Sequence, residues 1–95
     1  MRMDDSHIDR ALARIPEWRK TGDVIERTYA FASFVEAVAF VASVADVAEA
    51  ANHHPDIDIR YRRVRLALVT HDAGGLTLLD FSLAERCDAL AQSFA

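Results

Sequence analysis

Residues 33–52 constrain the fold of this chain more than any other segment, because they contain neither glycine nor proline. Twenty residues without a helix breaker predict one long helix. Three polar residues and two alanines fall close to one stripe of this helix, namely Glu36, Ala39, Ser43, Asp46 and Ala50. That stripe is the expected solvent-facing side.

The rest of the predicted helix is apolar over an unusually wide arc. The residues on this arc are Phe34, Val38, Phe40, Val41, Val44, Val47 and Ala48. One sheet in a small domain covers only part of such a surface. We therefore expect part of the helix to pack against another subunit. The alternative is a helix enclosed between its own sheet and the terminal helices.

The flanking sequence predicts two further helices and four strands. The helices are expected over Ser6–Ile15, with Ser6 as N-cap, and from Thr77 to about Ser93, with Thr77 and Asp80 as a capping box. Strands are expected over Trp18–Lys20, Val24–Phe31, Ile57–Tyr61 and Val64–Thr70, with turns at Thr21–Asp23 and Asp72–Gly75. The order α-β-β-α-β-β-α favours an α+β fold with two layers: a four-stranded antiparallel sheet with helices on one face.

Length and charge narrow the function. A chain of 95 residues forms a single domain (1–95), small enough for oligomerisation to help its stability. The net charge of −4 argues against nucleic acid as a partner, and the arginine cluster at positions 60, 62, 63 and 65 is typical of an edge-protecting strand face. The N-terminus lacks a secretory signal, and no apolar run is long enough for a membrane. A cytoplasmic location is expected.

Three of the four histidines lie at boundaries between predicted elements. His53 and His54 follow the long helix, and His71 follows a strand. Histidine is the natural proton carrier near neutral pH, and several together can divide acid and base roles, as a dehydration requires. Glu49 precedes His53 by one helical turn and is expected to hydrogen-bond its imidazole or to tune it electrostatically, while Asn52 is expected to cap the helix or to act as a neutral hydrogen-bond partner.

Other interpretations of these histidines compete. An isolated His-His-Pro segment most often only terminates a helix, with Pro55 blocking its continuation. The histidines, together with Glu49, Asp72 and Asp80, are competent metal ligands, but adjacent histidines diverge at a helix end and no His-x₃-His pair is present. None of the candidate bases His53, His54 and His71 adjoins Cys87 or a serine in sequence, so a nucleophilic mechanism is disfavoured.

The spacing of a larger residue set resembles the signature of the pterin-4a-carbinolamine dehydratase family. The set runs from Glu49 through Asn52-His53-His54-Pro55 to Tyr61, His71 and Asp80. Further similarity covers Trp18, the Phe31–Phe34 segment, Thr70-His71-Asp72, Gly75-Leu76-Thr77 and Leu83-Ala84, so that the resemblance extends over about residues 15–90. A signature of this length is far more specific than a short motif.

The resemblance implies dehydration of a 4a-hydroxytetrahydropterin to the quinonoid dihydropterin, as part of tetrahydropterin recycling. It implies His53 and His71 as the acid/base pair and His54 as a catalytic or substrate-orienting residue. Asn52, Glu49, Thr70 and Asp80 would support or contact the pterin substrate. No metal and no cofactor is expected. Family members form dimers and tetramers, so a homodimer or homotetramer is implied, with a functional link to an aromatic amino acid hydroxylase.

One position departs from the pattern, and two rival functions stay open. Asn52 stands where some family members carry an acidic residue, so any role that needs a carboxylate there is absent or is filled by another residue. Some relatives serve as dimerisation or assembly cofactors and need only the fold. A third possibility is action on another pterin, such as a molybdopterin precursor. The intact histidine set favours an enzyme over an assembly factor.

Overall fold

The computed structural model of the protein describes residues 1–94 and shows three helices and four strands. In chain order the elements are α1 (Asp5–Arg14), β1 (Arg19–Thr21), β2 (Val24–Ala30), α2 (Phe34–Ala51), β3 (Asp56–Arg60), β4 (Arg63–Leu68), a 3-10 turn (His71–Ala73) and α3 (Leu78–Gln92). The predicted α-β-β-α-β-β-α order and the α+β class are confirmed.

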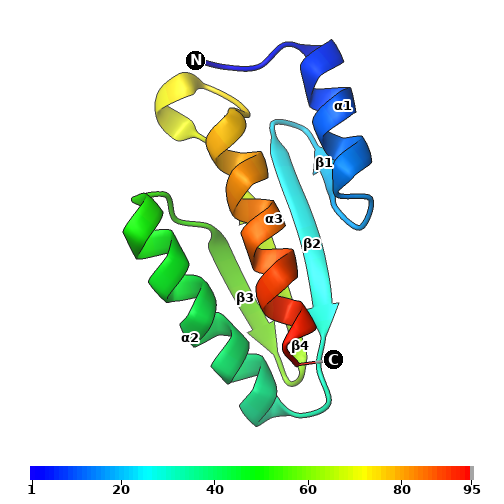
Figure 1. The fold of residues 1–95 in the computed structure, drawn as a ribbon, viewed down its shortest axis with the longest axis vertical. Helices are drawn as coiled ribbons and strands as arrows, with labels where there is room; N and C mark the ends of the chain where they lie inside the picture. Colours follow the sequence, from blue (N-terminus) through cyan, green and yellow to red (C-terminus); the bar gives the residue numbers. More distant parts are fainter. Residues whose placement is uncertain (95) are drawn as a thin grey trace.

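The four strands form one antiparallel sheet in the order β1-β2-β4-β3 (Figure 1). β2 and β4 are the central pair, with Ile25 opposite Leu68 and Tyr29 opposite Val64. β1 is short and pairs only with the start of β2. β3 is the other edge and pairs along its whole length with β4. β4 is therefore a central strand, with β2 on one side and β3 on the other. From the end of β4 the chain continues toward α3.

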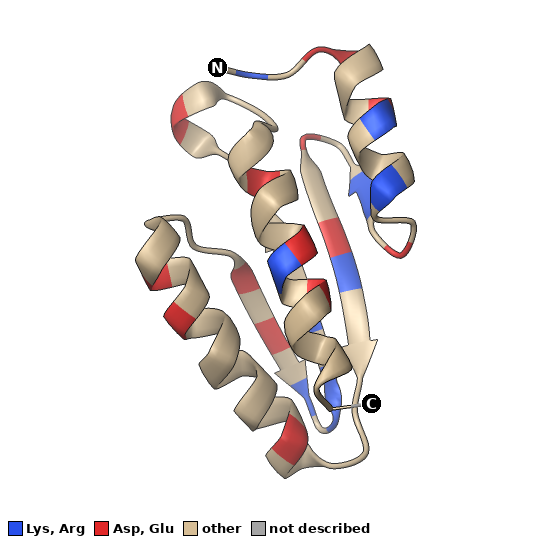
Figure 2. Ribbon diagram, in the orientation of Figure 1, with Lys and Arg blue, Asp and Glu red and all other residues tan. Residues whose placement is uncertain are grey.

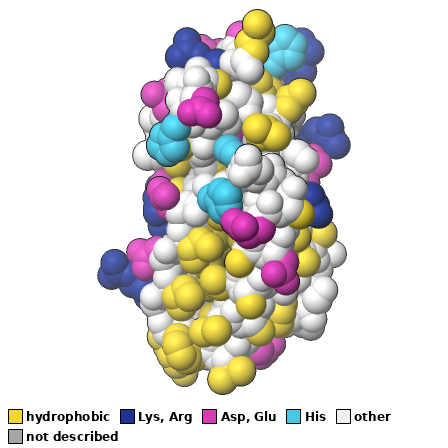
Figure 3. All heavy atoms as spheres, turned by 90° about the vertical axis from the view of Figure 1, so that its left-hand side faces the viewer, with side chains coloured by type: hydrophobic (Ala, Val, Ile, Leu, Met, Phe, Trp, Pro, Cys, Tyr) yellow, Lys and Arg dark blue, Asp and Glu magenta, His cyan; other side chains and the backbone are white. Residues whose placement is uncertain are grey.

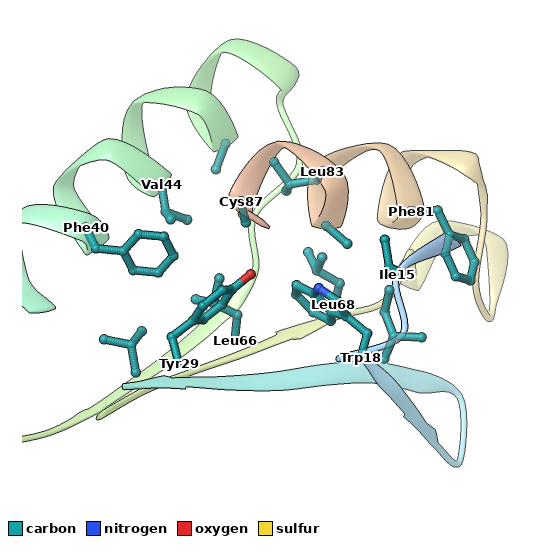
Figure 4. Packing of buried hydrophobic residues seen from close by; sticks show 14 of the residues in the cluster. Ile15, Trp18, Tyr29, Phe40, Val44, Leu66, Leu68, Phe81, Leu83 and Cys87 are labelled. Atoms are coloured by element: carbon teal, nitrogen blue, oxygen red, sulfur yellow. The ribbon is translucent and has the colours of Figure 1, made fainter. Parts of the chain in front are cut away.

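Helices α2 and α3 cover one face of the sheet, and the core lies between the two layers (Figure 4). Aromatic rings fill its centre: the Phe40 ring centroid lies 4.8 Å from the centroids of Tyr29 and Phe31. Alternate residues of β4 complete the floor, since Val64, Leu66 and Leu68 are buried as their alternation predicts. α1 lies beside β1 (Figure 1) and contributes the buried Ile8 to the core.

The long helix buries only one narrow stripe in its own domain. The buried positions of α2 follow a spacing of three or four residues and are Ala37, Phe40, Val44 and Ala48. Of the predicted apolar arc, Phe34 and Val38 are 50% and 42% exposed, and Val35 is exposed as well. No lysine or arginine lies on α2 (Figure 2).

These exposed side chains join others from β3 into one surface. We call Phe34, Val35, Val38, Ile57 and Ile59 the α2–β3 apolar face. Figure 3 shows hydrophobic side chains gathered over the lower part of this side of the molecule, with the histidines above them. Exposed patches of this kind mark interaction surfaces in soluble proteins.

Several helices and strands begin or end at other residues than predicted. α1 begins at Asp5, because the Asp4 carboxylate accepts the amide of His7 and so acts as the cap instead of Ser6. The same hydrogen bond lowers the pKa of Asp4 to about 2. The hairpin turn moves one residue later, to Gly22-Asp23, because Thr21 still pairs with Val24. β4 ends at Leu68, and Thr70 forms only an isolated bridge with Gly75.

The start of α3 is confirmed as a capping box. The Thr77 hydroxyl accepts a backbone hydrogen bond from the first turn, and the Asp80 carboxylate accepts the Thr77 amide at 2.9 Å. Leu76 before the cap and Phe81 after it are both buried, the arrangement of a hydrophobic staple. α3 therefore begins at a fixed place beside the end of β4.

Within residues 1–94, none of the helices has the length and apolar character that crossing a membrane would require.

Candidate active site

A pocket of about 200 Å³ lies where the C-terminal end of α2 meets the segment that follows β4. Its lining combines the two histidine segments of the sequence with their neighbours: Asn52, His53, His54, Val69, Thr70, His71 and Asp72. Residues 17 positions apart are therefore brought together, because both segments leave their elements at the same end of the domain (Figure 1). Glu49 and Asp80 do not line the pocket, and each hydrogen-bonds one of the histidines that do.

Asn52 directs the chain into this pocket. It has φ 50° and ψ 42°, the left-handed conformation that asparagine tolerates better than most residues. Its amide and that of His53 hydrogen-bond back to the last turn of α2, with His53 N 3.1 Å from the Ala48 carbonyl. The predicted helix cap is thus present.

His53 is held by a buried carboxylate. Its Nε2 lies 2.6 Å from Oδ1 of Asp80, whose side chain is fully buried, while the histidine side chain is 10% exposed. Because the other Asp80 oxygen accepts two further hydrogen bonds, the network assigns the hydrogen of this pair to Nε2 of His53. Nδ1 is then the nitrogen left free for chemistry.

Two threonines complete the support of Asp80. Oγ1 of Thr70 donates to Oδ2 of Asp80 at 2.8 Å, and the Thr77 amide donates to the same oxygen. The Thr77 hydroxyl lies 2.8 Å from that of Thr70 and accepts the Leu79 amide. Since the Thr70 hydrogen points to Asp80, Thr77 donates to Thr70. The chain of donors fixes the carboxylate before any substrate binds.

His54 has a different partner. Its Nε2 lies 2.6 Å from Oε1 of Glu49, and both side chains are more than half exposed. The expectation that Glu49 would bond to His53 is therefore wrong. The helical spacing of four residues ends with α2 at Ala51, and the left-handed turn at Asn52 aims His53 toward α3 and His54 back toward Glu49. The adjacent histidines diverge to two carboxylates, as predicted.

His71 lines the same pocket from a short closed loop. It is exposed and begins the 3-10 turn, which the Thr70–Gly75 bridge closes. The N-terminal segment crosses this loop from outside: the Met3 amide donates to the Leu76 carbonyl at 2.8 Å. Gly75 is buried beneath the Arg2 side chain, where an added Cβ would lie 2.4 Å from Arg2 Cδ.

The arrangement brings histidine side chains from two segments of the chain to one pocket, one of them oriented by a buried carboxylate. This is the equipment of general acid–base catalysis. Among residues 1–94 no three His, Cys, Asp or Glu side chains are grouped so that they could hold a metal ion. Sequence reasoning identified Thr77 only as a helix cap and missed its link to Thr70. The capping box was the available signal, because it fixes Asp80 next to the strand end.

Comparison with known proteins identifies the family of the chain. The family model described as pterin 4 alpha carbinolamine dehydratase matches residues 1–90. A provisionally named pterin-4-alpha-carbinolamine dehydratase of Chloroflexus aurantiacus is 55% identical over 89 residues, covering 94% of this chain and 96% of its own length. A protein of the same provisional name from Acidobacterium capsulatum is 59% identical over 83 residues, covering 87% and 90%.

Two solved structures share the fold. The transcriptional coactivator/pterin dehydratase of Brucella melitensis superposes with a TM-score of 0.92 at 34% identity, covering 96% of this chain and 99% of its own. A pterin dehydratase-like protein identified as a RuBisCO assembly factor of the alpha-carboxysome gives 0.68 at 28% identity, covering 79% and 89%. With the family model matching nearly the whole sequence, the chain belongs to the pterin-4-alpha-carbinolamine dehydratase family.

Proposed function

We propose that the protein dehydrates a 4a-hydroxytetrahydropterin to the quinonoid dihydropterin and water. The observation that carries this proposal is the pairing of His53 with the buried Asp80 in a pocket that His71 also lines. His53 has Nδ1 free to exchange a proton, and His71 lines the same pocket. Such a pair can act on two atoms of one substrate at the same time.

The reaction needs two proton transfers and no redox change. The acid histidine gives a proton to the 4a-hydroxyl, the C4a–O bond breaks, and water leaves. The base histidine takes the proton from N5, whose electron pair forms the new double bond to C4a. His53 and His71 fill these two roles. His54, held by Glu49 at the rim of the pocket, orients the pterin, and Asn52 and Thr70 contact it from the pocket wall.

The test is the decay of the 4a-hydroxypterin, generated in place by an aromatic amino acid hydroxylase and followed by absorbance. We expect faster decay with the protein present. His53→Ala and His71→Ala should each lower the rate by about 10²-fold or more, and His54→Ala should act mainly on KM. His7→Ala is the matched control, since His7 lies on α1 with Asp4 as its partner. Decay unchanged by the wild-type protein would refute the proposal.

The physiological setting that we propose is tetrahydropterin recycling beside an aromatic amino acid hydroxylase, in the cytoplasm. A genome that encodes no such hydroxylase would instead favour action on another pterin. The α2–β3 apolar face supports assembly into a homodimer or homotetramer, because its five large apolar side chains are between 36% and 74% exposed.

A second candidate is a role in assembling another protein. It is favoured by the similarity to the RuBisCO assembly factor and by the same apolar face. The two functions depend on different residues. An assembly factor should tolerate His53→Ala and His71→Ala together and should fail when Val35 and Val38 are made polar, whereas a dehydratase loses activity with the histidine pair.

A further inference from the structure

The three histidines of the pocket differ in how their side chains are held. His53 and His54 each hydrogen-bond a carboxylate at 2.6 Å. Within residues 1–94 the imidazole of His71 has no hydrogen-bond partner, and the residue is exposed. The place of His71 in the pocket therefore depends on the backbone of the loop that carries it.

The loop at residues 71–75 is closed by backbone hydrogen bonds among its own residues and Thr70. Their lengths lie between 3.0 and 3.3 Å. Thr70 connects the start of the loop to the rest of the domain, since its hydroxyl donates to the buried Asp80 at 2.8 Å. A loop that is held at one end only can pivot, so the position of His71 also depends on contacts at the far side of the loop.

The segment before α1 supplies such contacts (Figure 1). The Met3 amide donates to the Leu76 carbonyl at 2.8 Å, and Nη1 of Arg2 donates to the Gly74 carbonyl at 3.4 Å. The segment is fixed in turn, because Asp4 caps α1 and the Met3 side chain packs against the hydrophobic core. The far side of the loop is thus connected to α1.

Gly75 shows that the loop is adapted to this contact. Its φ lies outside the left-handed region, unlike the φ of 71° at Gly74, so the backbone conformation does not require a glycine there. A Cβ at position 75 would lie 2.4 Å from Cδ and 2.9 Å from Cγ of Arg2. The methylene groups of Arg2 therefore occupy the space that a side chain at position 75 would need.

We propose that Arg2 is a positioning residue, which holds the loop so that His71 keeps its place in the histidine pocket. This inference rests on the proposed dehydratase function, in which His71 exchanges one of the two protons. A displacement of about 1 Å at a reacting group can lower a rate by about 10²-fold. Arg2 does not line the pocket, so its loss should affect the reaction step and leave substrate binding intact.

The kinetic experiment compares Arg2→Ala with Arg2→Lys in the 4a-hydroxypterin decay assay. Alanine removes the methylene groups over Gly75 and the donor to Gly74, and should lower kcat by about tenfold or more while KM stays within about twofold of wild type. Lysine keeps both the methylene groups and a donor, and should keep kcat within about twofold of wild type. Arg10→Ala, the same change at an exposed position of α1, is the control and should leave kcat unchanged. An unchanged kcat in Arg2→Ala, or a loss confined to KM, would overturn the proposal.

A measurement that is independent of activity separates this inference from the function itself. Backbone ¹⁵N relaxation gives the order parameters of the amides at residues 71–75, which should be about 0.85 in the wild type and below about 0.6 in Arg2→Ala. The amides of α3 should keep their values, which excludes a general loosening of the fold. Order parameters of the loop that do not change in Arg2→Ala would refute the positioning role even in an active dehydratase. A wild-type protein without activity, combined with a loosened loop in Arg2→Ala, would refute the function and leave Arg2 as the support of the loop.

Discussion

Replacing Asp80 with asparagine would alter one buried side chain without changing its size. Oδ2 of Asp80 accepts the amide hydrogen of Thr77, which can only donate. The asparagine oxygen must therefore take the Oδ2 position, and its amide group must face Nε2 of His53. His53 then accepts a hydrogen bond at Nε2 and carries its own hydrogen on Nδ1, the reverse of the wild-type tautomer.

The two consequences differ in size. Oδ2 keeps its bonds from Thr70 and Thr77, while the charge-assisted bond to His53 becomes a neutral one, so we expect a loss of about 1–2 kcal/mol in the free energy of unfolding. For a domain of this length that lowers Tm by roughly 5–15 °C. The rate should suffer much more. In the Ser-His-Asp triad the same exchange holds the histidine in the wrong tautomer and costs about 10⁴-fold.

Thermal unfolding followed by circular dichroism gives the stability, and 4a-hydroxypterin decay gives the rate. Asp88→Asn is the matched control on the same helix, because one Asp88 oxygen accepts Trp18 Nε1 at 2.9 Å and Arg27 Nη1 at 2.8 Å, away from the histidines. We expect it to lower Tm similarly and to leave the rate within about twofold of wild type. An Asp80→Asn protein that kept a third or more of the wild-type rate would refute the proposed role of His53.

Three further outcomes are expected. Burial, then the nearby Asp88 carboxylate, raises the pKa of the Cys87 thiol to about 12. The unfolded thiol loses its proton near pH 9 and the folded one does not, so the free energy of unfolding should fall between pH 9 and 12. The thiol should react with a disulfide reagent only when the protein unfolds. Reaction of the native protein would contradict this. Gly75→Ala should cost about 1 kcal/mol in a denaturant titration by displacing Arg2, and Arg2→Ala should restore part of the loss; additive effects would exclude that contact. Val35→Asp with Val38→Asp should reduce the proposed homo-oligomer to monomers in sedimentation velocity, and an oligomer unchanged by these substitutions would place the interface elsewhere.

Sequence patterns determined the elements well where the pattern was periodic. The alternation in β4, the uninterrupted run of α2 and the capping box of α3 are all present as expected, because each depends on residues close together in the chain. Boundaries were less certain where two polar residues competed. Asp4 caps α1 in place of Ser6, since its carboxylate is the one that reaches the His7 amide.

The sequence alone identified the histidine set, its spacing and the family to which the chain belongs. Only the tertiary structure decided which carboxylate His53 and His54 each hydrogen-bond. His53 lies 27 positions from Asp80, and no periodicity links a helix end to the first turn of another helix. The left-handed turn at Asn52 breaks the spacing that would have joined His53 to Glu49. Local sequence thus determines which groups are present, whereas the partner of each group depends on where the sheet and the helices place their ends.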